Sequence, residues 1–167
     1  RGSRLEGYYL GMHAFGLEEM GDYAVAEAAG TRAVERDPRD AWAIHAVAHV
    51  LEMTNRVAAG QQWLACRADD WSEDNFFAIH NWWHLALFYL DQQRWDEVLT
   101  LYDTRIRGTD SAVIMDMLDA SALLWRLRLH GVDVGDRWQR LAAVWEPHID
   151  DAWDSFNDTH AMMSFVG

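Results

Sequence analysis

Apolar residues recur along the chain three and four positions apart, a spacing that places side chains on one face of a helix. Short turns separate these stretches, as at Met20-Gly21-Asp22. No segment alternates between apolar and polar residues for long enough to predict a strand. Asp40 and Asp110 are predicted to cap helix N-termini. The pattern predicts pairs of helices over residues 7–40, 41–75, 76–110 and 111–148, and part of a fifth pair over 151–167.

A repeated motif relates the second predicted pair to the third. The string Ala-Ile-His, followed after three intervening residues by a second His, occurs at 43–49 and again 35 residues later at 78–84. A period near 34 residues is typical of tetratricopeptide repeats, and Trp82, Leu85 and Tyr89 are similar to the skeleton of their first helix. The sequence therefore predicts a single all-α domain, residues 1–167, folded as a right-handed α-solenoid of tetratricopeptide-like helical hairpins.

Composition and charge indicate which kinds of molecule this protein could bind. Half of the residues are hydrophobic and a quarter are charged, so the chain is expected to fold. The formal net charge is −13 and all 14 cationic side chains are arginine, so the surface would repel a phosphate backbone. We therefore expect no nucleic-acid partner, and a basic or amphipathic peptide is the natural protein ligand.

The sequence also carries expectations about location. No apolar run approaches about 18 residues, so neither a membrane span nor a membrane partner is expected. The single cysteine, Cys66, cannot form an internal disulfide, and we expect a buried thiol in a cytoplasmic protein. The chain starts without methionine and stops just after an apolar run, which indicates a piece of a longer protein. Exposed repeat ends of such a piece would favour dimerisation.

Histidines are the sharpest chemical feature of the sequence. Each copy of the repeated motif carries two histidines four residues apart, which therefore share a helix face. They are His45, His49, His80 and His84. Glu52 continues the helix face that carries His45 and His49. Asp119 lies 35 residues after His84, so it occupies the equivalent position one repeat later. A polar column across three units is expected.

Imidazole and carboxylate groups at this spacing are ligands for zinc and similar divalent ions. The zinc-hydrolase motif His-Glu-x-x-His is absent, because Ala46 follows His45 and Asn81 follows His80. The same groups also bond to one another in polar seams between helices that hold no metal. Both interpretations stay open, and no catalytic residue is assigned.

Four strings of the sequence resemble the tetratricopeptide repeat protein 38 family. They are HAVAHVLEM at 45–53, HNWWHLALF at 80–88, LDASALLWRL at 118–127 and FNDTHAMM at 156–163. The resemblance extends from about Gly11 to Val166, and members of that family are longer than this chain. It implies a solenoid of tetratricopeptide-like hairpins and carries no established biochemical activity.

The leading hypothesis is a scaffold that binds a protein or peptide on the concave face of the solenoid and requires no cofactor. The residues expected on that face are His45, His49, Glu52, His80, Trp83, His84 and Asp119. The alternative is a metal-binding protein or metal-dependent enzyme that uses zinc or a similar divalent metal. Its candidate ligands are His45, His49, His80, His84, Asp119 and His160.

Overall fold

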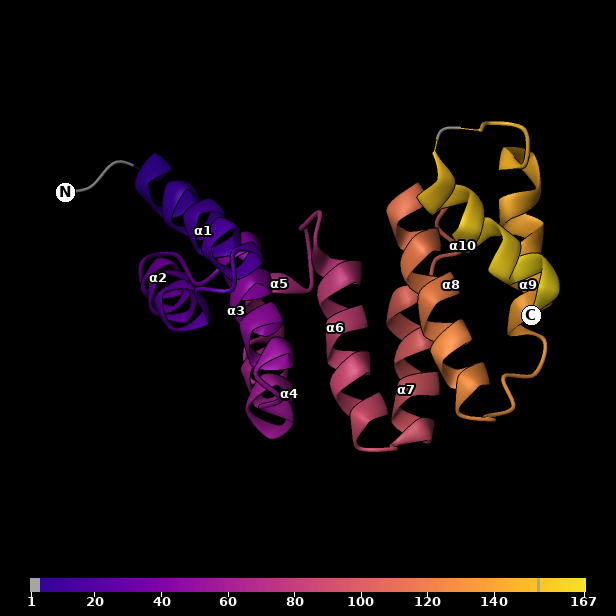
Figure 1. Ribbon diagram of the computed structural model, residues 1–167, viewed down its shortest axis with the longest axis horizontal. Coiled ribbons are helices and arrows are strands. Elements are labelled where there is room, and N and C mark those ends of the chain that lie inside the picture. Colours follow the sequence, from indigo (N-terminus) through magenta and orange to yellow (C-terminus); the bar gives the residue numbers. More distant parts are fainter. Residues whose placement is uncertain (1–3, 153) are drawn as a thin grey trace. The chain divides into compact units, whose positions relative to one another are not determined.

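Helices account for all the regular secondary structure in the computed structural model, which describes residues 4–152 and 154–167 (Figure 1). The predicted all-α class is confirmed, and the described part of the chain contains no strand. Residues 1–3 and 153, which fall within the predicted domain and its last repeat unit, lie outside the described residues. The chain divides into two compact units, one ending at Phe88 and the other beginning at Tyr89.

Among its described residues, 4–88, the first unit contains five helices and most of a sixth. They are α1 (Arg4–Glu19), α2 (Tyr23–Arg36), α3 (Ala41–Met53), α4 (Val57–Ala65), α5 (Ala68–Trp71) and α6 (Ala78–Asp91), within which the boundary falls. Gly21, with φ at 82°, and Asn55, with φ at 56°, occupy the turns after α1 and α3. The predicted N-cap at Asp40 is confirmed, since its Oδ1 accepts a hydrogen bond from the backbone N–H of Ala43 at 3.1 Å.

Small side chains allow α1, α2 and α3 to pack closely against one another (Figure 1). Ala14 of α1, Ala29 of α2 and Ala46 of α3 form one fully buried cluster. Phe15 and Leu17 pack against this cluster. The last turn of α1 is therefore held against α3, an arrangement that matters for the site described below.

A glycine also sets the approach of α4 to α6. Gly60 is buried on α4, and a Cβ atom at this position would overlap the ring of Phe88 on α6. That ring is itself fully buried, so it has little room to move. Nearby, the indole N–H of Trp71 donates to the carbonyl of Leu64 at 3.1 Å and completes the packing of α5.

The second unit is built around α8 (Ile114–Leu129). Its other elements are α7 (Trp95–Leu101), the π-helical turn η1 (Tyr102–Ile106), α9 (Arg137–Trp145), the 3-10 turn η2 (Glu146–His148) and α10 (Ser155–Val166). The Trp145 indole N–H donates to the Ser121 hydroxyl at 3.0 Å, and this hydroxyl lies 3.1 Å from that of Ser164. The buried chain links α8, α9 and α10.

Two local predictions are wrong. Asp110 does not cap a helix: it has φ at 46° in a turn, and the next helix begins at Ile114 after extended residues. Cys66 is exposed, because α4 ends at Ala65 and the cysteine follows at its C-terminus on the surface. A bilayer-spanning helix is not found among residues 4–152 and 154–167.

We expect Gly60→Ala to destabilise the first unit by about 1–3 kcal/mol, the usual effect of overpacking a filled core. The matched control is Gly16→Ala, since a Cβ at Gly16 on α1 meets nothing within 4 Å. That control should stabilise the protein by roughly 0.5–1 kcal/mol, because alanine is the better helix former. Urea unfolding of both variants tests the packing, and equal effects would contradict it.

Candidate metal centre

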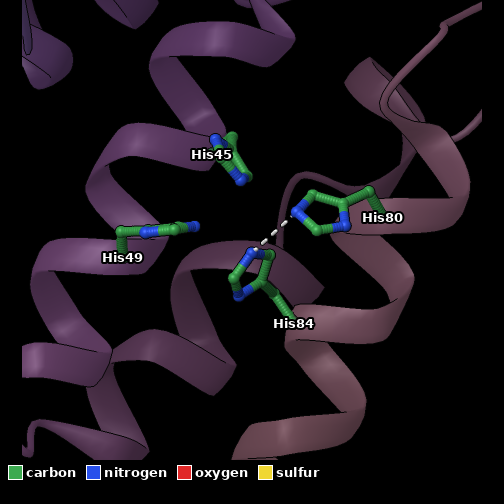
Figure 2. Close-up of side chains that lie close together, drawn as sticks. All are labelled: His45, His49, His80 and His84. Atoms are coloured by element: carbon green, nitrogen blue, oxygen red, sulfur yellow. Dashed lines mark hydrogen bonds between the residues drawn. The ribbon is translucent and has the colours of Figure 1, made fainter. Parts of the chain in front are cut away.

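Four histidine side chains from two helices of the first unit point into one shared space. His45 and His49 lie one turn apart on α3, and His80 and His84 lie one turn apart on α6. Figure 2 shows all four rings directed toward one another between the two helices. This set, His45, His49, His80 and His84, is called the histidine tetrad below.

The tetrad is compact enough to hold a single ion. Five of its six ring pairs have centroid separations between 4.3 and 5.0 Å. Each residue offers one ring nitrogen, and the four nitrogens lie within 4.8 Å of one another. Nitrogens held about 2.0–2.1 Å from a tetrahedral zinc ion lie roughly 3.3 Å apart. The Nε2 atoms of His80 and His84 are already 3.2 Å apart.

Hydrogen bonds orient the rings of the α6 pair. Glu52 Oε2 lies 3.1 Å from His84 Nδ1, and a carboxylate only accepts, so that nitrogen carries the ring proton. His84 Nε2 is then a lone-pair acceptor, and His80 donates to it through Nε2 (Figure 2). A carboxylate that fixes the imidazole tautomer in this way is a common partner of a metal-ligating histidine.

A second carboxylate approaches the α3 pair. Glu18, from the last turn of α1, places Oε2 3.4 Å from His49 Nδ1. Glu18 is only 5% exposed, because α1 packs directly on α3. The carboxylate therefore faces the side of the His49 ring that carries Nδ1.

Two members of the tetrad bury nitrogens without a hydrogen bond. Within the described residues, neither ring nitrogen of His45 has a partner, nor does Nε2 of His49. His45 is only 3% exposed. An unsatisfied buried polar group typically costs about 1–3 kcal/mol, so it needs a physical explanation. A cation bound by one nitrogen of His45 and by Nε2 of His49 would satisfy two of these three atoms, and the third would carry the ring proton of His45.

Aromatic rings enclose the tetrad. Phe15 and Phe77 have ring centroids 5.5 and 5.1 Å from that of His45. Trp83 stacks on His80 at 5.4 Å with an interplanar angle of 10°. Such a shell lowers the local dielectric and strengthens any bond between an ion and its ligands.

The surroundings of the tetrad favour the neutral form of two of its histidines. Burial lowers the pKa of His45 well below its usual value, and the neighbouring rings of His84, His49 and His80 act in the same direction. The pKa of His49 is also lowered, first by burial, although Glu52 opposes the shift. Neutral imidazole is the form that ligates a metal, so these shifts favour ligation.

The structure brings together some of the predicted site residues and assigns others to the second unit. Glu52 and Trp83 contact the tetrad, and both are half-buried. Asp119 lies in the second unit, where it is buried on α8. His160 lies on α10, where its Nδ1 donates to the carbonyl of Phe156 at 2.8 Å. The tetrad and its carboxylates are built entirely within the first unit.

Sequence reasoning missed Glu18. A usable signal existed, because Glu18 precedes Glu52 by 34 residues and therefore occupies the equivalent position one repeat earlier. Both carboxylates lie in the last turn of a helix, of α1 and α3 respectively. The enclosing rings of Phe15 and Phe77 carried no comparable signal.

Comparison with known proteins finds no family model that matches the chain and no solved structure with significant similarity.

We expect the metal-free protein to lose stability as the pH falls below about 6.5, the imidazole pKa of an unfolded chain. His45 has a lowered pKa when folded, so below pH 6.5 the unfolded state binds its proton first. The loss should approach about 1.4 kcal/mol per pH unit for one such histidine. Glu18, whose pKa is raised by burial and by Glu19, contributes with the opposite sign above about pH 4.5.

Urea unfolding of chelator-treated protein between pH 8 and 5.5 measures this dependence. His45→Phe fills similar space without a titrating group, so its free energy of unfolding should vary less with pH than that of the wild type. His13→Phe, at an exposed position on α1, should keep the wild-type slope. Parallel slopes for the wild type and His45→Phe would contradict the assignment.

Proposed function

We propose that this protein binds a divalent transition-metal ion, zinc or a similar ion, through the histidine tetrad. The observation that carries the proposal is the convergence of four imidazole nitrogens within 4.8 Å, together with the buried His45 nitrogens that lack hydrogen-bond partners. Four neutral nitrogen donors suit zinc, copper, nickel or iron better than magnesium or calcium, which prefer oxygen ligands.

The ligand count supports a structural role for the ion. Structural zinc sites are closed by four protein ligands, whereas catalytic sites keep a position for water or substrate. The tetrad supplies four protein donors, two from α3 and two from α6. An ion here would clamp these two helices together, and we propose no reaction for it.

Glu52 supports the proposed metal site because it holds the ring proton of His84 on Nδ1. With Nδ1 bonded to Glu52, His84 directs the lone pair of Nε2 toward the tetrad. His80 currently donates through its own Nε2, so metal binding would move that ring proton to Nδ1. The rearrangement moves one proton within the His80 ring.

We expect chelator-treated protein to bind Zn²⁺ or Co²⁺ stoichiometrically, with a visible absorption band typical of tetrahedral Co²⁺. His49→Ala and His84→Ala should each weaken binding by at least about 100-fold, since losing an outer partner alone costs 10–100-fold. Zn²⁺ at 100 times its Kd should stabilise the wild type by about 2.7 kcal/mol. Calorimetric titration and thermal unfolding measure both effects.

The matched control for this experiment is His13→Ala, which removes an exposed histidine of the same unit and should bind like the wild type. Far-ultraviolet circular dichroism checks that the tetrad variants keep their helices. Wild-type protein that gains neither absorption nor stability with either metal would contradict the proposal.

We further propose that the helix pairs form part of a right-handed tetratricopeptide-like solenoid, as the resemblance to the tetratricopeptide repeat protein 38 family implies. The packing of α1, α2 and α3 on small residues and the repeated motif at 43–49 and 78–84 support this proposal. The single cysteine, which is free and exposed, supports a cytoplasmic location.

A specific cavity favours a second candidate function, the binding of a basic peptide. The cavity has a volume of about 290 Å³ and lies beside Trp42. Its lining includes four aromatic residues, three aspartates and one arginine: Tyr8, Trp42, Phe76, Phe77, Asp37, Asp40, Asp74 and Arg39. Aromatic faces and carboxylates both attract ammonium and guanidinium groups, as does the net charge of −13.

We expect a fluorescein-labelled arginine-rich peptide to bind this cavity and its glutamate counterpart not to bind. Phe76→Ala should weaken binding roughly 2–5-fold, the effect of losing an exposed cation–π contact. Phe76 is 72% exposed, so the substitution should leave the fold intact. Fluorescence anisotropy measures the Kd, with Phe156→Ala, another exposed phenylalanine, as the control. Equal effects of the two variants would contradict this site.

A further inference from the structure

Two acidic side chains lie at the C-terminal end of α1. Glu18 and Glu19 are the last two residues of this helix, whose last turn contains no basic side chain. The C-terminus of a helix already carries the negative end of its dipole, where a cation is stabilising. This end of α1 lies against α3, close to His49.

Three potential ligand atoms converge there. Glu18, Glu19 and His49 each offer one donor atom, and the three donors lie within 4.8 Å of one another. Within the described residues, Glu18 Oε2 has no hydrogen-bond partner, although the residue is only 5% exposed. That oxygen is directed at His49 Nδ1, 3.4 Å away. A buried carboxylate oxygen without a donor is satisfied by a cation.

His49 belongs to both groups of donors. Its Nδ1 faces Glu18, whereas its Nε2 has no hydrogen-bond partner and is the nitrogen left for the tetrad. The two nitrogens lie on opposite sides of the imidazole ring, so one ring can ligate two ions.

We propose that Glu18, Glu19 and Nδ1 of His49 form a second divalent-metal position, and that the His49 ring bridges this ion and the ion of the tetrad. The bridge rests on the proposed metal function of the tetrad. Binding of both ions removes the last proton of the His49 ring, which passes to solvent. The second position has two oxygen donors and one nitrogen, so its donor set is chemically harder than the four nitrogens of the tetrad. With only three protein donors, it also leaves a coordination position for water.

Metal stoichiometry tests this proposal. Chelator-treated protein is titrated with Co²⁺ and passed through a desalting column, and cobalt is then quantified against protein. The wild type should retain two equivalents, and Glu18→Gln and Glu19→Gln should each retain one equivalent with the tetrahedral absorption unchanged. Glu19 is exposed, so its variant should fold even if the buried Glu18→Gln does not. The control Glu35→Gln, at an exposed position on α2, should retain two equivalents.

His80→Ala separates the two proposals. Suppose that the wild type retains only one equivalent of cobalt. If the glutamate variants keep that equivalent and His80→Ala loses it, the second position is overturned and the tetrad site is supported. One equivalent with the reverse pattern would support the position at Glu18 and Glu19 and overturn the tetrad. A glutamate variant that only weakens a single equivalent would overturn the second position and make Glu18 a positioning residue. No retained metal in the wild type would overturn both proposals.

The shared ring has a spectroscopic test of its own. When Cu²⁺ fills both positions, magnetic coupling through the His49 ring should reduce the electron paramagnetic resonance intensity per copper. The Glu19→Gln variant, with one copper, should show full intensity. Full intensity per copper in doubly loaded wild type would overturn the bridge.

Discussion

Unsatisfied imidazole nitrogens between α3 and α6 are the constraint on which the rest of the first unit depends. A buried polar atom must find a partner, and both ring nitrogens of His45 are buried without one. The surrounding phenylalanine and tryptophan rings present apolar faces to the tetrad. An ion shared by the four imidazoles would satisfy one nitrogen of each ring, and the other nitrogen of His45 would then carry the ring proton.

Other contacts in the first unit position the helices around the tetrad. Asp40 caps α3, which fixes where that helix begins and which of its faces carries His45. Alanine contacts bring the last turn of α1 against α3 and so carry Glu18 to the edge of the site. Gly60 lets α4 meet Phe88 on α6 at short range. Packing that looks purely structural thus decides which carboxylates reach the histidines.

Negative charge gives the two proposed activities a common physical basis. The net charge of −13 favours cations of any kind, whether a metal ion or a basic side chain. Selectivity then depends on the donor set. Buried nitrogens in an aromatic shell suit a dehydrated transition-metal ion, whereas the cavity beside Trp42, with its exposed rings and carboxylates, suits a large organic cation.

Much of this molecule could be predicted from the sequence, because helix periodicity, turn residues and spacing are local properties of the chain. They predicted the all-α class, the N-cap at Asp40 and the pairing of histidines on one helix face. Local patterns failed at Asp110, which has a positive φ and lies before the observed N-cap at Val113, and at Cys66, which the end of α4 leaves on the surface. Only the tertiary structure decided that α3 and α6 direct their histidines at each other and that Glu18 joins them. The repeat spacing placed these side chains at equivalent positions, but the directions of the rings depend on how side chains fill the space between helices.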